Sequence, residues 1–379
     1  MSEWLTREEA LARLKVRPQT LYAYVSRGRI GMRPDTDDPR RSQYRADDIA
    51  ALATRRARGR SPQAIAESAI AWGEPAIATA ISTVLHGRLV YRGRDAAALS
   101  ATATLEEAAS LLWATDAPVS FASSAASGTH TGTPAAFARL AGLAAEGRAS
   151  LGRGPALLQQ DGAGASGVLA DALGAIPGSA PVHERLAQGW SVDAAGAVLI
   201  RKALVLLADH ELNASTFAAR VAASTGAPVA ACLLAGLATL SGPRHGGAGA
   251  ATLAFAEDAE RLGPDEAVVR WLGHDRPLPG FGHQLYPEGD PRAEALLAGL
   301  DVDNGLSRLR DAVLAATGML PNIDFALAAL TRGLRLPADA PFRLFALGRS
   351  IGWTAHAIEQ VTSKRPIRPR ARYDGPIGV

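Results

Sequence analysis

The stretch that decides the fold lies near the middle of the 379-residue chain, where AAGAVLIRKALVLLA (Ala194–Ala208) runs directly into DHELNAST (Asp209–Thr216). Apolar residues in the first part recur at the spacing of a helix. The second part is a dense cluster of polar and ionisable side chains at the end of that helix. The sequence therefore predicts a largely apolar helix whose end presents candidate site residues.

The same helical periodicity recurs in Leu105–Trp113 and Ala227–Leu240, whereas strand patterns are sparse. Ile81–Val84 and Arg88–Tyr91 fit a short hairpin, and Ser120–Gly154 is rich in Ala, Gly, Ser and Thr without strand alternation. Only 5% of the residues are aromatic, which leaves small and aliphatic side chains to build a core of closely packed helices. We therefore predict an all-α body.

Composition and charge exclude several classes of protein. With 47% hydrophobic residues the chain has enough apolar surface to fold, which excludes a disordered polypeptide. The net charge is +3, but residues 1–60 carry 14 Lys and Arg against 8 Asp and Glu, so the basic excess is N-terminal. The single cysteine, Cys232, excludes an intrachain disulfide framework and a cysteine-rich zinc site. No apolar run approaches the ~20 residues that span a bilayer, and no signal segment follows Met1, so we expect a cytoplasmic protein without a membrane partner.

Residues 1–60 show the pattern of a small module of their own. Thr6 can cap a first helix while Glu9 reaches back to the cap, and a second short helix ends at Gly28. The turn-forming run Pro34–Pro39 then separates two short strands, as in a wing. This order of elements resembles the winged helix-turn-helix of MerR and excisionase-type proteins, whose second helix is expected to enter the DNA major groove.

The resemblance implies DNA as a partner of this module, with a contacting set formed by Tyr22, Tyr24, Arg27, Arg29, Arg40 and Arg41. The alternative is a basic module that packs on its neighbours or binds protein, since a basic excess of six gives only modest phosphate affinity unless dimerisation doubles it. Residues 61–76 are expected to form a linker to the helical body.

Residues that suit catalysis stand in a few short blocks. Three of the eight histidines lie in such blocks: His210 in DHELNAST, His245 in GPRHGGA (Gly242–Ala248) and His283 in GFGH (Gly280–His283). Asp324 lies between apolar side chains in PNIDF, where desolvation raises the basicity of a carboxylate. Together with several arginines, the set supplies a base and imidazole donors, which enolisation of a carbonyl compound beside a bound dicarboxylate requires. A metal site is the poorer alternative, because these motifs show no metal-ligand spacing.

The remaining histidines and one carboxylate are interpreted as structural: His86, His130, His183, His274, His356 and Glu211.

The four blocks resemble, in order, those of the citrate synthase family. Asp209–Thr216 is similar to its DHELNAST block, Gly242–Ala248 to GPLHGGA, Gly280–His283 to GFGH and Pro321–Phe325 to PNVDF. The resemblance runs from about Ile77 to the C-terminus and includes RPRARY (Arg368–Tyr373), which is similar to the family's RPRAxY. It implies a two-domain helical body, with a large domain of residues 77–221 plus 333–379 and a small domain of residues 222–332.

The resemblance also implies an acyltransferase that condenses acetyl-CoA with oxaloacetate to give citrate and CoA, with no cofactor besides these substrates. Asp324 would take a proton from the acetyl methyl group, while His245 would donate a hydrogen bond to the thioester oxygen. His283 would polarise the oxaloacetate ketone and protonate the alkoxide as it forms.

Further residues would bind the dicarboxylate. By resemblance, His210, Arg292 and Arg349 would hold the oxaloacetate carboxylates, for which a guanidinium is well suited. Arg368 would complete the site of the partner subunit, so a homodimer is expected to be the active form.

Four positions depart from the family pattern. Gly249 stands where the family has asparagine, Arg244 replaces an apolar residue beside His245, and Gln284 and Pro287 replace basic residues. A cation at Arg244 would favour neutral His245, and the lost basic residues remove contacts to CoA phosphates. Two alternatives therefore stay open: a synthase for a related substrate, such as 2-methylcitrate synthase, and a DNA-binding regulator that senses acetyl-CoA or oxaloacetate.

Overall fold

The computed structural model describes residues 4–14, 16, 21, 24–25, 30–35, 42–50, 52, 77–123, 130–273, 278–371 and 375. The chain forms two compact units, Thr79–Arg368 and a smaller unit made of Met1–Ala78 with Pro369–Val379. In the part of the chain that is described, no helix is both long enough and apolar enough to cross a membrane.

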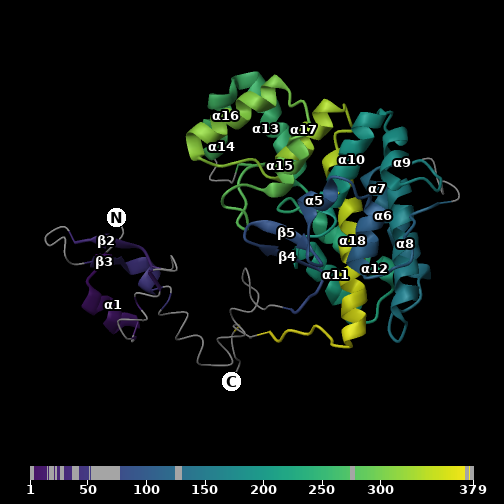
Figure 1. Ribbon diagram of the computed structural model, residues 1–379, viewed down its shortest axis with the longest axis horizontal. Coiled ribbons are helices and arrows are strands. Elements are labelled where there is room, and N and C mark those ends of the chain that lie inside the picture. The colour runs from purple at the N-terminus through teal and green to yellow at the C-terminus, as the bar shows by residue number, and fades with distance from the viewer. Residues whose placement is uncertain are drawn as a thin grey trace. The chain divides into compact units, whose positions relative to one another are not determined.

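The larger unit is mostly helical and carries one small sheet (Figure 1). Its strands are β4 (Ser82–Leu85), β5 (Arg88–Tyr91) and β6 (Arg94–Asp95). Its helices are α5 (Ala96–Ser100), α6 (Leu105–Trp113), α7 (Thr133–Glu146), α8 (Pro155–Ala172), α9 (Val182–Gly189), α10 (Ala194–Leu207), α11 (Ala214–Ser224), α12 (Val229–Leu240), α13 (Ala248–Leu262), α14 (Pro264–Leu272), α15 (Pro291–Leu297), α16 (Asn304–Thr317), α17 (Ile323–Gly333) and α18 (Ala340–Ser363). The predicted helical body is confirmed, and the predicted hairpin is present as β4 and β5.

The predicted and observed helices agree where large aliphatic residues repeat at helical spacing. Leu105–Trp113 is α6, and Ala194–Ala208 matches α10 to within one residue. By contrast, Ser120–Gly154, for which no element was predicted, contains α7. The buried residues of α7 are only Ala136 and Leu140, so its sequence carries too weak a periodic signal.

Two hydrophobic cores organise the larger unit. The first surrounds α18, which is buried along nearly its whole length and packs against α6, α8, α10, α11 and α12 (Figure 1). The second is formed by side chains of α13, α14, α16 and α17. Although α12 falls within the predicted small-domain range, it belongs to the first core, and α17 contributes to both. The domain boundary at residues 222–332 stays a prediction.

The smaller unit contains α1 (Arg7–Leu14) and a sheet of β1 (Trp4–Leu5), β2 (Met32–Pro34) and β3 (Ser42–Arg45), with β3 in the middle. The predicted cap is confirmed, because Glu9 accepts from the Thr6 backbone N–H at 2.8 Å and Thr6 Oγ1 accepts from the Glu9 N–H at 3.4 Å. The strands predicted on either side of the wing turn pair as antiparallel β2 and β3. Of the predicted DNA-contacting set, Tyr24 is half-buried, and the members outside the described residues are Tyr22, Arg27, Arg29, Arg40 and Arg41.

Candidate active site

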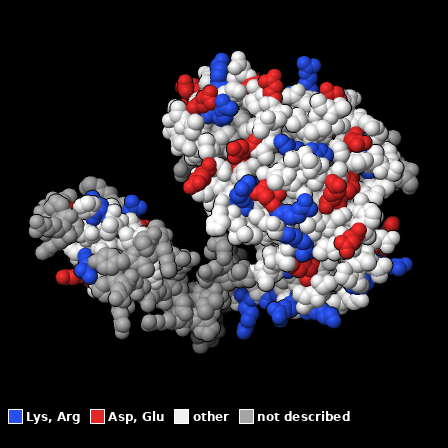
Figure 2. Space-filling model, in the orientation of Figure 1, with Lys and Arg blue, Asp and Glu red and all other residues white. Residues whose placement is uncertain are grey.

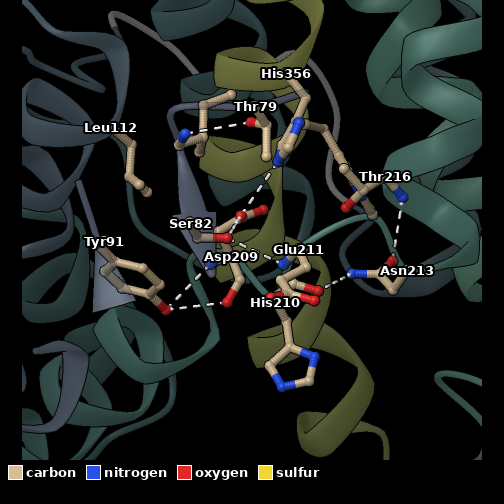
Figure 3. Close-up of polar contacts among 12 residues, drawn as sticks. Thr79, Ser82, Tyr91, Leu112, Asp209, His210, Glu211, Asn213, Thr216 and His356 are labelled. Carbon is tan, nitrogen blue, oxygen red and sulfur yellow. Dashed lines mark hydrogen bonds and ion pairs between the residues drawn. The ribbon is translucent and has the colours of Figure 1, made fainter. Parts of the chain in front are cut away.

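The DHELNAST block forms the turn between α10 and α11 and continues into α11 (Figure 3). Asp209 is fully buried there, and its Oδ2 accepts hydrogen bonds from the Ser82 hydroxyl and from His356 Nε2, the latter at 3.2 Å. The Tyr91 hydroxyl lies 3.1 Å from the backbone carbonyl oxygen of Asp209. Side chains from β4, β5 and α18 therefore hold the start of this turn.

His356 connects two charged groups inside the core. Arg220 donates from its guanidinium to His356 Nδ1 at 3.0 Å, so the proton of the ring resides on Nε2 and is donated to Asp209. Arg220 also pairs with Glu359 at 2.5 Å. These contacts give His356 the structural role that the sequence predicted.

Glu211 bends the chain after the site histidine. Its φ of 53° lies in the left-handed region. Its Oε1 accepts from the Val84 backbone N–H at 2.7 Å and from the Thr83 hydroxyl at 3.0 Å. The Glu211 carboxylate is thus bound to β4, while the neighbouring His210 imidazole points away from the Asp209 network (Figure 3).

Three rings meet on the other side of this turn. The His210 ring centroid lies 5.2 Å from that of His283, and the His283 centroid lies 4.8 Å from that of Tyr286. The Tyr286 hydroxyl is 2.8 Å from His210 Nε2. Because His283 Nδ1 accepts from the Leu285 backbone N–H at 3.1 Å, the proton of the neutral ring is on Nε2. His283 therefore offers an N–H donor to a ligand.

His245 reaches the same region from the loop before α13. Its Nε2 lies 2.9 Å from Ser215 Oγ, and its ring packs edge-on against Phe345 with 5.7 Å between centroids. Ser215 Oγ also lies 2.7 Å from Asn213 Oδ1, and Asn213 caps α11. The DHELNAST block thus positions His245 as well as His210.

The three imidazoles are neutral at neutral pH. Burial lowers the pKa of His245 and of His283 to about 4, and it holds the pKa of His210 well below its usual value. Positive charge adds to this, from Arg349 beside His245 and from Arg292 beside the other two rings. All three rings can therefore serve as hydrogen-bond donors without carrying charge.

Asp324 is the second residue of α17, where Asn322 caps the helix by accepting from the Asp324 N–H at 3.0 Å. Burial raises the pKa of Asp324 to about 6, in the direction that its apolar flanks predict. The positive charges of Arg292 and Arg349 act against this rise, whereas the negative charge of Asp290 adds to it. At neutral pH Asp324 is ionised and is a stronger base than an exposed aspartate.

Two buried arginines differ in how far their donors are satisfied. Arg292 makes a bidentate pair with Asp290, through Nε to Oδ1 at 2.9 Å and through a terminal nitrogen to Oδ2 at 2.7 Å. Arg349 donates through Nε to the Leu207 carbonyl at 2.9 Å, but among the described residues its second terminal nitrogen has no hydrogen-bond partner. A buried N–H without an acceptor is costly, and a ligand carboxylate would supply one.

A cavity of about 180 Å³ lies beside His283, between the loops 282–290 and 317–321. Tyr286 and Pro287 also line it, and none of the described lining residues is Lys or Arg. The lining offers rings, glycines and backbone to a ligand, but no cation for a phosphate group.

The structure shows the surroundings of three of the positions that depart from the family pattern, Gly249, Arg244 and Gln284. A Cβ at Gly249 would lie 2.6 Å from the Cβ of Pro341, so asparagine does not fit there. Arg244 is exposed, and the cation that lowers the pKa of His245 is Arg349. His245 is therefore neutral as expected, but burial and Arg349 are the cause, and the expected role of Arg244 is wrong. Gln284 is exposed.

Six of the seven predicted site residues lie close enough for their charges to act on one another: His210, His245, His283, Arg292, Asp324 and Arg349. Arg368 is exposed in the segment that follows α18, and the part of α18 from Arg349 to its end is itself about 21 Å long. Arg368 therefore stands apart from the cluster of its own chain. Tyr286 and Ser215 were missed as site residues, although Ser215 lies inside the quoted DHELNAST block.

Comparison with curated proteins gives partial matches. Residues 168–370 match the family described as citrate synthase, C-terminal domain. Citrate synthase 2 of Bacillus subtilis (strain 168) is 38% identical over 186 residues, which cover 46% of this chain and 50% of the relative. The 2-methylcitrate synthase 2 of Corynebacterium glutamicum is 36% identical over 191 residues, which cover 46% and 48%. The chain spans about half the length of the curated relatives it matches.

Solved structures match over more of the chain. Citrate synthase from Thermotoga maritima MSB8 superposes with a TM-score of 0.67 at 25% identity, covering 81% of this chain and 95% of that one. The ternary complex of Thermoplasma acidophilum citrate synthase with carboxymethyl coenzyme A and oxaloacetate gives a TM-score of 0.65 at 25% identity, covering 80% and 94%. Since the family match alone takes in more than half of the sequence, the chain belongs to the citrate synthase family.

Proposed function

We propose that this protein condenses acetyl-CoA with oxaloacetate to give citrate and CoA. The observation that carries the proposal is the unsatisfied buried nitrogen of Arg349 among neutral imidazoles and a carboxylate of raised pKa. In such a cluster Arg349 can donate to a substrate carboxylate, and Asp324 can take a proton from a carbon atom of the substrate. Family membership and the ternary complex of the Thermoplasma acidophilum enzyme support this assignment.

The first step is formation of an enolate. Asp324, ionised at neutral pH, takes a proton from the methyl group of acetyl-CoA, and its raised pKa favours this transfer. His245 donates a hydrogen bond to the thioester oxygen, where negative charge develops. For this the Ser215 hydroxyl donates its proton to His245 Nε2, which leaves the single proton of the neutral ring on Nδ1, the nitrogen that donates to this oxygen.

The second step is carbon–carbon bond formation. The enolate carbon attacks the ketone carbon of oxaloacetate, whose oxygen accepts a hydrogen bond from His283 Nε2 and then takes its proton. Water then hydrolyses the citryl thioester, which releases CoA and citrate. Arg292, Arg349 and His210 hold the oxaloacetate carboxylates throughout. These arginines are buried, whereas Lys and Arg on the visible face of the larger unit are interspersed with Asp and Glu (Figure 2).

The assay for this function is thiol release from acetyl-CoA, measured with and without oxaloacetate. We expect release that requires oxaloacetate, and pyruvate in its place should give none. Propionyl-CoA with oxaloacetate tests the alternative that the protein is a 2-methylcitrate synthase. One of the curated relatives carries that name. No release with any of these pairs would contradict the enzyme assignment.

The same proposal includes a homodimer, in which Arg368 of the partner subunit completes each site. The sequence of α12, VAACLLAGLATL, contains no charged residue, yet Leu234, Ala235 and Ala238 lie on a side that the single chain does not bury completely. A helix that is apolar all round belongs in an interior, and a second copy would provide it. Light scattering should give twice the chain mass, and a monomer at micromolar concentration would contradict this part.

For the N-terminal module we propose a winged helix-turn-helix that binds DNA. The capped α1, the antiparallel β2 and β3, and the local excess of Lys and Arg support it. Duplex binding by the full chain should weaken strongly from about 50 to 200 mM salt and should be lost in a variant with Arg27→Gln and Arg29→Gln. The regulator alternative predicts that acetyl-CoA or oxaloacetate changes this binding and that Asp324→Asn leaves it intact.

A further inference from the structure

Tyr286 is a buried side chain that contacts three of the predicted site residues, although nothing in the reaction described above uses it. It is 2% exposed and lies in the loop between His283 and α15. Its hydroxyl is 2.8 Å from His210 Nε2, and its ring lies 4.8 Å from the His283 ring. The Arg292 guanidinium lies 5.2 Å from the centre of the same ring.

The contact with His210 differs in kind from the other two. The His283 ring has its own anchor, the Leu285 N–H at Nδ1, and Arg292 has its own bidentate partner, Asp290. For the His210 ring, the Tyr286 hydroxyl is the one hydrogen-bond partner found among the described residues. The orientation of His210 about its terminal side-chain bond therefore depends on Tyr286.

This dependence has a consequence for the ring's protonation. Burial and the charges of Arg292 and Arg349 hold the pKa of His210 well below its usual value, so the ring is neutral and exists as one of two tautomers. The phenol O–H is a stronger donor than a neutral imidazole N–H, so Tyr286 donates to Nε2. This direction leaves the ring proton on Nδ1, which can then donate to a ligand. Without that bond, both tautomers and the flipped ring become accessible.

The hydrogen bond also joins parts of the chain that are distant in sequence. His210 follows α10 in the first core, while Tyr286 follows the GFGH loop and lines the cavity beside His283. A single hydroxyl thus sets the position of the His210 imidazole relative to His283 and Arg292, which would bind the same small dicarboxylate.

We propose that Tyr286 is a positioning residue, whose hydroxyl holds the His210 imidazole in the orientation and tautomer that bind the carboxylate of a 2-oxo dicarboxylic acid. The proposal rests on the function proposed above and adds to it a residue that determines affinity for that substrate. The residue acts through His210 and does not take part in proton transfer.

The test is Tyr286→Phe, which keeps the ring contacts to His283 and Arg292 and removes the hydroxyl. We expect the KM for oxaloacetate to rise about fivefold, the effect of one hydrogen bond to a neutral group, while kcat stays within about twofold and the KM for acetyl-CoA is unchanged. Tyr44→Phe, the same change at a buried tyrosine of the N-terminal unit, is the matched control and should change none of these values.

A second readout separates positioning from general support of the fold. In ¹⁵N spectra of histidine-labelled full-length protein, we expect His210 to show one neutral tautomer and Tyr286→Phe to show a mixture, with a melting temperature close to that of the parent. A Tyr286→Phe variant with an unchanged or lower KM for oxaloacetate would overturn the proposal, as would a parallel fall in kcat, both affinities and melting temperature. A parent protein that neither releases CoA nor binds oxaloacetate in calorimetry would overturn this proposal and the proposed function together.

Discussion

Asp324→Asn is expected to lower kcat for CoA release by about 10³-fold, the loss expected when a general base is removed, while oxaloacetate still binds. Asparagine has nearly the same size and leaves the Asn322 cap and the start of α17 intact. It cannot accept the methyl proton, because its amide is a very weak base. Steady-state kinetics and calorimetric titration with oxaloacetate measure the two effects separately.

The pH dependence of thiol release by the parent protein provides a related check on Asp324. Only ionised Asp324 is a base, so kcat/KM should fall as the pH drops through about 6, to which burial raises the pKa of this carboxyl. His245 and His283 remain neutral over this range, because their pKa values are lowered to about 4. A rate that stays constant from pH 7 down to pH 5 would contradict the assignment of Asp324 as the base.

Ionised Asp324 should also affect stability: the anion that catalysis needs lowers the free energy of unfolding, because it is buried. Because its pKa is raised in the folded state, folding favours the protonated carboxyl, and this contribution is lost as the pH rises through about 6. At pH 7 the folded protein holds a partly desolvated anion, which Asp324→Asn removes. We therefore expect the variant to melt at a higher temperature than the parent at pH 7, and at an equal or lower one at pH 4.

How much the sequence predicted depended on whether a feature is local. The histidines and Asp324 could be selected as candidate site residues because each stands in a short block with its own glycines, cap or apolar flanks. The helices α6 and α10 were predicted because their apolar residues repeat at helical spacing. In each case neighbouring residues along the chain carry the information.

Features that depend on contacts through space could not be predicted in this way. The contact of Tyr286 with His210 joins two loops 76 positions apart, and no local motif marks it. The charge beside His245 was assigned to its neighbour Arg244, but the chain folds so that Arg349 of α18 acts on it. The helix α7 was not predicted, because alanines occupy both its buried and its exposed positions and the helical spacing of apolar residues is therefore not apparent in its sequence.

Gly352→Ala is expected to disturb the fold directly beside the candidate site. Gly352 lies in the buried part of α18, and its N–H donates to the Ala208 carbonyl at 2.9 Å. A Cβ there would lie 2.5 Å from the Ala208 oxygen and would overlap Asp209 Oδ1. Both atoms belong to the start of the DHELNAST turn, which Ser82 and His356 hold in place. The turn would have to move, and His210 with it.

The sign of this effect is decided by sterics. Alanine is intrinsically favoured over glycine in a helix by about 1 kcal/mol, whereas overpacking of a rigid interior costs about 3 kcal/mol. We therefore expect Gly352→Ala to lower the free energy of unfolding by about 2 kcal/mol and to raise the KM for oxaloacetate through the displaced His210. Gly164→Ala is the matched control, because Gly164 lies exposed in α8 with no heavy atom within 4 Å of the added Cβ. That variant should be slightly more stable than the parent in urea unfolding, so equal stability of both variants would show that the close approach of α18 to Asp209 is not rigid.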